Sequence, residues 1–181
     1  FHGTERGVQE QAEMVQAIAA EHGGADFAWT TNPEDRKKLW QARHDAAYAN
    51  KALRPNGQVW ATDVCVPISR LAECIAETKK HIDASFIPAP IVGHVGDGNF
   101  HLTLVLDPND PRDAAEADRI NNRLVARALA LDGTCTGEHG VGYGKVDFLV
   151  AEHGEAVSVM RMIKRALDPD NIMNPGKIVR V

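Results

Sequence analysis

Hydrophobic residues recur at helical spacing along much of the chain. Between residues 7 and 22 the apolar positions fall on one face of a helix, and Gly23-Gly24 ends the segment. Asn32 and Pro33 then form a favourable start for a second helix. The same periodicity predicts further helices from Ser69 to about His81, from Asp110 to about Leu131, and at about 145–153 and 155–167.

A second pattern predicts strands between these helices. The extended or alternating segments are Asp26–Thr30, Gln58–Val66, Ser85–Val95 and Asn99–Leu106. The last two are close enough in sequence to form a hairpin. Strands that alternate with helices but include a hairpin favour an α+β layer over a doubly wound parallel sheet.

His94 and His101 flank the glycine-rich segment between the two strands of this hairpin. The dipeptide Asp97-Gly98 is favoured in two-residue type I′ turns. A turn at that position places His94 directly opposite His101. Directly opposed residues share a face, with Cβ atoms roughly 4.5–5.5 Å apart. The sequence therefore predicts two imidazoles that can bind one divalent metal ion.

Glu138 and His139 form a second candidate group, with glycines on both sides. Flanking glycines favour a loop whose backbone approaches other groups closely. Since zinc binds imidazole nitrogen together with carboxylate oxygen, Glu138 is a candidate for the third ligand. The residues alone leave open that the histidines are ordinary strand residues and the loop only a turn. An Fe(II) oxygenase site is a further alternative, although its closely spaced His-x-Asp/Glu pair is absent.

Two other features raise questions of chemistry. Arg43 lies on the apolar stripe of the second predicted helix, where a charge needs an anionic partner. That partner is either a structural carboxylate or a substrate carboxylate, which the planar guanidinium suits. The segment Gly140–Lys145 is glycine-rich, but Val146 follows the lysine. The GxxxxGK[ST] pattern of a phosphate-binding loop is therefore not met.

Composition narrows the class of protein. The chain is 44% hydrophobic and 25% charged, which is usual for a globular domain. A net charge of -5 and the absence of a basic run argue against nucleic acid as a partner. No apolar segment approaches the length of roughly 18 residues that a membrane span needs. The three cysteines have no CxxC spacing and are expected to be reduced thiols: Cys65, Cys74 and Cys135.

Several longer motifs give the chain a specific resemblance. His94-Val-Gly-Asp-Gly-Asn-Phe-His101, Gly133-Thr-Cys-Thr-Gly-Glu-His-Gly140 and Asn174-Pro-Gly-Lys177 resemble motifs of FAD-linked 2-hydroxyacid dehydrogenases. They match the C-terminal domain of these flavoproteins of the vanillyl-alcohol-oxidase type. Within the group, Leu39-Trp-Gln-Ala-Arg-His44 and Ala61-Thr-Asp-Val-Cys-Val-Pro-Ile-Ser-Arg70 are similar to the cytochrome-linked D-lactate dehydrogenases. The resemblance runs nearly from end to end.

The resemblance implies a fold and a domain organisation. The expected fold is α+β, a ferredoxin-like antiparallel sheet with helices packed on one face. Members of the family carry FAD on a large upstream domain, and no GxGxxG fingerprint is present here. We therefore expect residues 1–181 to be the C-terminal substrate- and metal-binding part of a longer enzyme, with an N-terminally truncated sheet. The fragment alone is expected to hold no FAD and to be inactive.

The resemblance also implies a role for each site residue. The divalent metal, Zn or Mn, is expected on His94, His101 and Glu138. His139 is then free to act as the general base that takes the hydroxyl proton of a D-2-hydroxyacid, while hydride passes to FAD. The remaining implied roles are substrate binding by Arg43 and Asn99, and contact with the flavin by Asn174 and Lys177.

Two alanines bear on the substrate. Relatives that act on D-2-hydroxyglutarate are expected to hold its second carboxylate with a hydroxyl residue and a lysine, at positions that are Ala47 and Ala61 here. Alanine cannot bind an anion, so lactate or another short monocarboxylate fits better. D-2-hydroxyglutarate and glycolate dehydrogenases of the same family remain alternatives. An alternative of another class is a metal-stapled structural or interaction domain without activity.

The expected partners follow from the same resemblance. The electron acceptor would be one such as cytochrome c or a quinone, with neither nucleic acid nor a membrane span involved. The expected location is cytoplasmic, with peripheral attachment to the inner membrane as an alternative, and mitochondrial in a eukaryote. The sequence leaves the oligomeric state open.

Overall fold

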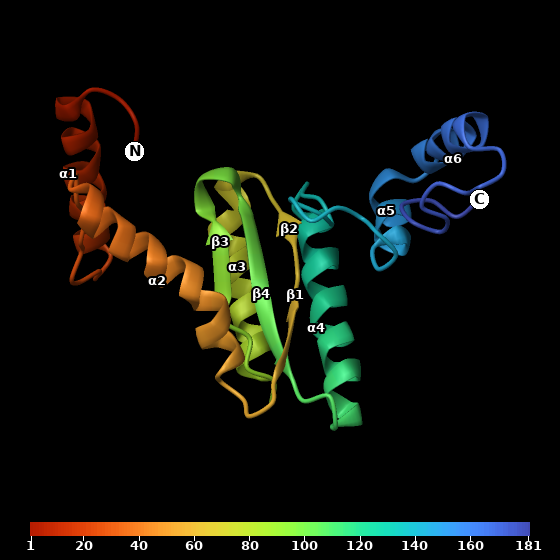
Figure 1. The fold of residues 1–181 in the computed structure, drawn as a ribbon, viewed down its shortest axis with the longest axis horizontal. Coiled ribbons are helices and arrows are strands. Elements are labelled where there is room, and N and C mark those ends of the chain that lie inside the picture. Colours follow the sequence, from red (N-terminus) through yellow and green to blue (C-terminus); the bar gives the residue numbers. More distant parts are fainter. The chain divides into compact units, whose positions relative to one another are not determined.

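The computed structural model describes residues 1–181 and divides into two compact units, Phe1–Ala46 and Ala47–Val181 (Figure 1). The first unit contains α1 (Glu5–Glu21), and α2 (Pro33–Lys51) begins in it. The side chain of Asn32 accepts hydrogen bonds from the N–H groups of Glu34 and Asp35. Those groups have no partner inside the helix, so the predicted cap at Asn32-Pro33 is confirmed.

The strand predicted at Asp26–Thr30 is wrong, because this segment forms neither helix nor strand. The elements of the first unit are helical, so a short extended segment there finds no neighbouring strand with which to pair. A strand without such a partner is not stable. The sequence pattern of residues 26–30 alone could not show that no neighbouring strand is present.

The second unit is built around one long strand. β4 (Asn99–Leu106) is paired antiparallel with β1 (Gln58–Ala61), β2 (Val64–Cys65) and β3 (Ile91–His94). β1 and β2 follow one another in a single register along one edge of β4, and β3 pairs with its other edge (Figure 1). The predicted antiparallel α+β architecture is therefore confirmed.

Two helices cover one face of this sheet. Phe100, Leu102 and Leu104 alternate along β4 and are fully buried against α3 (Ile68–Asp83) and α4 (Pro111–Ala130). Figure 1 shows α3 behind the strands and α4 beside them. The order of strand, helix, two strands and helix is that of a ferredoxin-like unit. The opposite face carries the intervening residues of β4, which include His101.

The end of the chain forms a smaller helical pair. α5 (Val146–His153) and α6 (Ala156–Leu167) are separated by Gly154, whose φ of 52° lies in the left-handed region. Leu149, Val157 and Val179 form a buried cluster with these helices. None of the helices in the chain combines the length and the apolar character that crossing a membrane requires.

The predicted two-residue turn at Asp97-Gly98 is wrong. The chain instead makes a turn of 3-10 helix at Val95–Asp97 and closes it with Gly98 at φ 74°. Only glycine fits at position 98, because a Cβ there would overlap the carbonyl oxygen of Val66. The longer loop pairs His94 with Asn99 and leaves His101 opposite Val92.

Candidate functional site

His94 and His101 lie on the same face of the sheet although they are not directly opposed. His94 pairs with Asn99, and Asn99 shares a face with His101 two residues further along β4. The two imidazole rings therefore meet diagonally, edge to face, with centroids 6.1 Å apart. The shared face that the sequence predicted is confirmed, and the direct pairing is wrong.

The ring of His101 is held in one orientation by the neighbouring strand. Its Nδ1 lies 2.8 Å from the carbonyl oxygen of Thr62. Since a carbonyl only accepts hydrogen bonds, Nδ1 carries the hydrogen and donates it. In the neutral ring Nε2 is then a free lone pair, the arrangement usual for a metal-binding histidine whose other nitrogen is hydrogen-bonded.

Glu138 brings its carboxylate to both histidines. Its Oε1 lies 2.9 Å from Nε2 of His101 and 3.5 Å from Nε2 of His94. Two acceptors at 2.9 Å repel each other unless a proton or a metal cation lies between them. The donor atoms of the three residues all lie within 4.8 Å of one another. Two nitrogens and one carboxylate oxygen are a ligand set that suits zinc.

His139 lies beside this group. Its ring stacks on that of His101 with centroids 4.9 Å apart and an interplanar angle of 7°. Its Nε2 is 3.7 Å from Oε1 of Glu138, and its side chain is 49% exposed. Nε2 of His139 is therefore close to the possible metal ligands His94, His101 and Glu138, and a small molecule can reach it from solvent.

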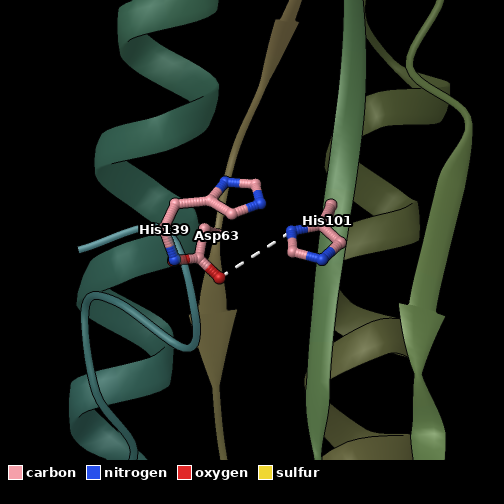
Figure 2. A group of neighbouring side chains, drawn as sticks. All are labelled: Asp63, His101 and His139. Carbon is pink, nitrogen blue, oxygen red and sulfur yellow. Dashed lines mark hydrogen bonds and ion pairs between the residues drawn. The ribbon is translucent and has the colours of Figure 1, made fainter. Parts of the chain in front are cut away.

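Asp63 is a residue of this site that the sequence patterns did not reveal. It is 1% exposed and lies between β1 and β2, opposite His101 in the register that both strands share. Figure 2 shows its carboxylate pointing towards His101, with the ring of His139 close by. The distance from Asp63 Oδ1 to His101 Nδ1 is 3.8 Å. The one signal in the sequence was a charged residue within a predicted strand that carries no other charge.

The carboxylate of Asp63 accepts hydrogen bonds from a set of surrounding donors. The donors are the side chains of Asn99, Thr136 and Lys145 and the backbone N–H groups of Glu138 and His139, at 2.9–3.3 Å. Burial alone would raise the pKa of this carboxyl. The hydrogen bonds from His139, Asn99 and Lys145 and the charge of Lys145 outweigh burial and hold the pKa of Asp63 well below its usual range.

Two overlapping groups could in principle hold a cation: Asp63 with His101 and His139, and His94 with His101 and Glu138. The lone pairs of Asp63 are occupied by its hydrogen bonds, and the ammonium of Lys145 lies 3.0 Å from its Oδ2. A nearby positive charge disfavours a metal ion there. The residues of the second group have no such cation, so they fit a divalent metal better.

Arg43 and Asn99 are the two predicted substrate-binding residues. Arg43 lies in the Phe1–Ala46 unit with its guanidinium over the ring of Trp40, and α2 has no buried residue, so the predicted buried stripe is wrong. Asn99 is 5% exposed and donates to Asp63 and to the carbonyl of Val64, both at 2.9 Å. Its substrate contact and the substrate contact of Arg43 stay predictions.

Asn174 and Lys177 meet each other near the end of the chain. Nζ of Lys177 donates to Oδ1 of Asn174 at 3.1 Å and lies 5.5 Å from the ring centroid of Tyr143. The tail is tied to the loop after His139, because the N–H of Ile178 donates to the carbonyl of Gly142 at 2.8 Å. The flavin contact of Asn174 and Lys177 stays a prediction.

Neither the cysteines nor residues 140–145 belong to the candidate metal-ligand set of His94, His101 and Glu138. All three cysteines are free thiols, as predicted. Burial and a hydrogen bond with Glu152 raise the pKa of Cys135 to about 12, so its thiol stays protonated. Lys145, at the end of the glycine-rich segment, donates to the carbonyl and to the carboxylate of Asp63.

Comparisons with known proteins point to one family. A family model described as "FAD linked oxidases, C-terminal domain" matches residues 1–178. A probable mitochondrial D-lactate dehydrogenase of Danio rerio is 51% identical over 182 residues, which cover 100% of this chain and 37% of the relative. The mitochondrial D-lactate dehydrogenase [cytochrome] of Arabidopsis thaliana is 48% identical, with 99% of this chain and 32% of the relative covered.

A more distant similarity is to glycolate oxidase subunit GlcD of Escherichia coli, at 28% identity over 97% of this chain and 35% of the relative. The chain thus spans about a third of the length of the curated relatives it matches.

Proposed function

We propose that this chain, which belongs to the family of FAD-linked oxidase C-terminal domains, is the catalytic part of a dehydrogenase that acts on D-lactate or a similar 2-hydroxyacid. The reaction would oxidise a D-2-hydroxyacid to the 2-oxoacid, with FAD as the hydride acceptor. The observation that carries this proposal is the convergence of His94, His101 and Glu138 beside the accessible ring of His139. Relatives named D-lactate dehydrogenase at 42–51% identity support the choice of reaction.

The three converging donors would hold a divalent cation, Zn or Mn. When bound, such an ion acts as a Lewis acid that lowers the pKa of a hydroxyl group next to it. The contribution of the chain is to present two neutral imidazole nitrogens and one carboxylate oxygen on a single face. The hydrogen bond from His101 Nδ1 to Thr62 keeps Nε2 of His101 directed at that group.

His139 is the proposed general base. Its Nε2 lies beside Glu138 and is exposed, so it can take the hydroxyl proton of a substrate bound at the donor group. Imidazole is suited to this task near neutral pH because its proton affinity lies close to the working pH. The stacking of His139 on His101 favours this orientation of its ring.

The face of the sheet that carries the site also bears on the proposed substrate class. Ala61 pairs with Thr103 on β4, and Thr103 shares its face with His101. A side chain at position 61 therefore lies on the site face, where alanine offers no charge to a second carboxylate. This supports a short monocarboxylate such as D-lactate over D-2-hydroxyglutarate. Glycolate is the second candidate, because GlcD is among the relatives.

Partners and location are part of the proposal. The bracketed word cytochrome in the names of three relatives supports a cytochrome as electron acceptor. Four relatives are named mitochondrial, which supports a mitochondrial location in a eukaryotic host. FAD would be held mainly by a domain outside residues 1–181.

The test is a substrate panel on the full-length flavoprotein. The protein is mixed anaerobically with D-lactate, L-lactate, glycolate or D-2-hydroxyglutarate, and loss of the oxidised flavin absorbance is followed in a stopped-flow instrument. We expect the fastest reduction by D-lactate and a large discrimination against L-lactate. Faster reduction by glycolate would select the second candidate. If no 2-hydroxyacid reduces the flavin, the structural-domain alternative replaces the dehydrogenase.

A further inference from the structure

Asp63 connects the two parts of the candidate metal site, which come from distant parts of the sequence: the histidines of the sheet, His94 and His101, and Glu138 of the loop. It lies between β1 and β2, opposite His101, and it accepts the N–H groups of Glu138 and His139. We propose that Asp63 is a positioning residue that folds the Glu138–His139 loop onto the face of His94 and His101. This inference rests on the function proposed above and adds a residue to which neither the motifs nor the relatives assign a role.

The backbone of residues 137–140 makes hydrogen bonds only to Asp63, through the N–H groups of Glu138 and His139. Gly137, Glu138, His139 and Gly140 are all exposed, and Gly140 has a φ of 77°. Glycine-rich segments have high conformational entropy, so an ordered loop needs specific contacts. The hydrogen bonds to Asp63 from Thr136, Glu138 and His139 supply such contacts, and each loop donor meets the same buried carboxylate.

A carboxylate is required because every group that surrounds it is a donor. Successive backbone N–H groups at Glu138 and His139 form a concave anion-binding arrangement. An asparagine at position 63 would offer one acceptor oxygen and would turn an NH₂ group towards other donors. Hydrogen bonds to a charged acceptor are also stronger than those to a neutral one. The substitution Asp63→Asn therefore removes the attraction without changing the size of the side chain.

Lys145 makes this buried charge tolerable. Its Nζ donates to Oδ2 of Asp63 at 3.0 Å and to the carbonyl of Asp63 at 3.1 Å. A buried carboxylate without a cationic partner is costly. Because Lys145 follows the loop in sequence, the same ion pair closes the loop on the side away from Thr136. Asp63 thus anchors the loop at both of its ends.

The decisive experiment compares Asp63→Asn with Asp113→Asn in the full-length flavoprotein. Like Asp63, Asp113 is 1% exposed and paired with a cationic side chain, here that of Arg54. It lies at the start of α4, near the end of β4 that is remote from His101. Both variants lose a buried charge, and only Asp63→Asn should disturb the loop. The measurements are hydrogen exchange of the peptide over residues 136–142 in metal-free protein, affinity for Zn²⁺ and Mn²⁺, and the rate of flavin reduction.

For Asp63→Asn we expect about tenfold faster exchange at the Glu138 and His139 amides. We also expect roughly 10–100-fold weaker metal binding, the range typical of lost outer-shell contacts. Asp113→Asn should leave both quantities as in the wild type. Equal loop exchange and equal metal affinity in the two variants would overturn the proposal.

A second variant covers the case in which Asp63→Asn does not fold. Thr136→Val keeps the shape of the side chain and removes one donor to Asp63. We expect a smaller effect in the same direction, with exchange and metal affinity changed severalfold. Unchanged values in Thr136→Val would then reject the positioning role. Loop exchange is independent of the substrate, so a failure of the D-lactate panel alone would reject the proposed function and leave this inference standing.

Discussion

Gly137 should be the position in the loop least tolerant of a side chain. A Cβ built there would overlap Nδ2 of Asn99 and lie 2.9 Å from Oδ1 of Asp63. Neither neighbour can retreat. Asn99 is buried and donates two hydrogen bonds of 2.9 Å, and Asp63 is surrounded by its donors. The substitution Gly137→Ala therefore has to be accommodated by movement of the loop itself.

The size of the effect follows from this geometry. Carbon needs roughly 3.5–4 Å from a non-bonded neighbour, so the backbone at residue 137 must move by about 1 Å or more. The hydrogen bonds from Glu138 and His139 to Asp63 already measure 3.0–3.3 Å, and a shift of that size breaks them. A misplacement of about 1 Å near reacting groups can lower a rate by roughly 10²-fold. We expect a loss of this order in the rate of flavin reduction, together with weaker metal binding.

Gly144→Ala is the matched control, since a Cβ there meets nothing within 4 Å and the residue is not in the left-handed region. Both variants are prepared as full-length flavoprotein, dialysed, and measured for metal content by mass spectrometry and for flavin reduction by D-lactate. Thermal unfolding shows whether the fold as a whole is affected. If Gly137→Ala reacts as fast and retains as much metal as Gly144→Ala, the close approach of the loop to Asn99 is not the contact that positions the site.

Three further predictions follow from the same structure. His139→Asn should keep its metal and lower the rate of flavin reduction by roughly 10²–10⁴-fold, whereas Glu138→Ala should lose metal on dialysis. Metal content and stopped-flow rates are measured for both variants, and the reverse pattern would mean that the two residues have each other's role. Arg54→Met leaves the carboxylate of Asp113 buried without its cation and should lower the unfolding free energy by about 3 kcal/mol in urea titrations, and an unchanged midpoint would contradict it. Ala61→Lys should raise kcat/KM for D-2-hydroxyglutarate relative to D-lactate, and an unchanged ratio would show that position 61 does not contact the tail of the substrate.

The sequence was sufficient where local pattern decides the structure. The N-terminal cap of α2, the main helices and the extended segments that became β1 to β4 each depend on residue patterns within short stretches of the chain, and these were predicted. The face shared by His94 and His101 was also predicted, despite the wrong turn. Side chains alternate with a period of two, so a register error of two residues leaves every side chain on its own face, whereas an error of one would have separated the histidines.

What the sequence could not provide depends on contacts between distant segments. The four-residue hairpin loop forms because Gly98 approaches the carbonyl of Val66, a contact that no turn preference encodes. The stripe on α2 that seemed suited to burial carries no buried residue. Periodicity shows that a helix has an apolar side, but it does not show which surface covers that side.

Asp63 illustrates the same limit at the site itself. Its neighbours in sequence show only an acid within a predicted strand. The role proposed for it rests on Thr136, Glu138, His139 and Lys145, which the fold places around it. A carboxylate that binds metal must keep lone pairs free, whereas one that organises a loop must have them occupied. Hydrogen bonding therefore separates the two acids of this site: Glu138 is exposed, with its oxygen directed at two imidazoles, and Asp63 is buried with its lone pairs taken. That division supports the two proposed roles, metal binding by Glu138 and loop positioning by Asp63, although each residue belongs to a group of possible metal ligands by distance alone.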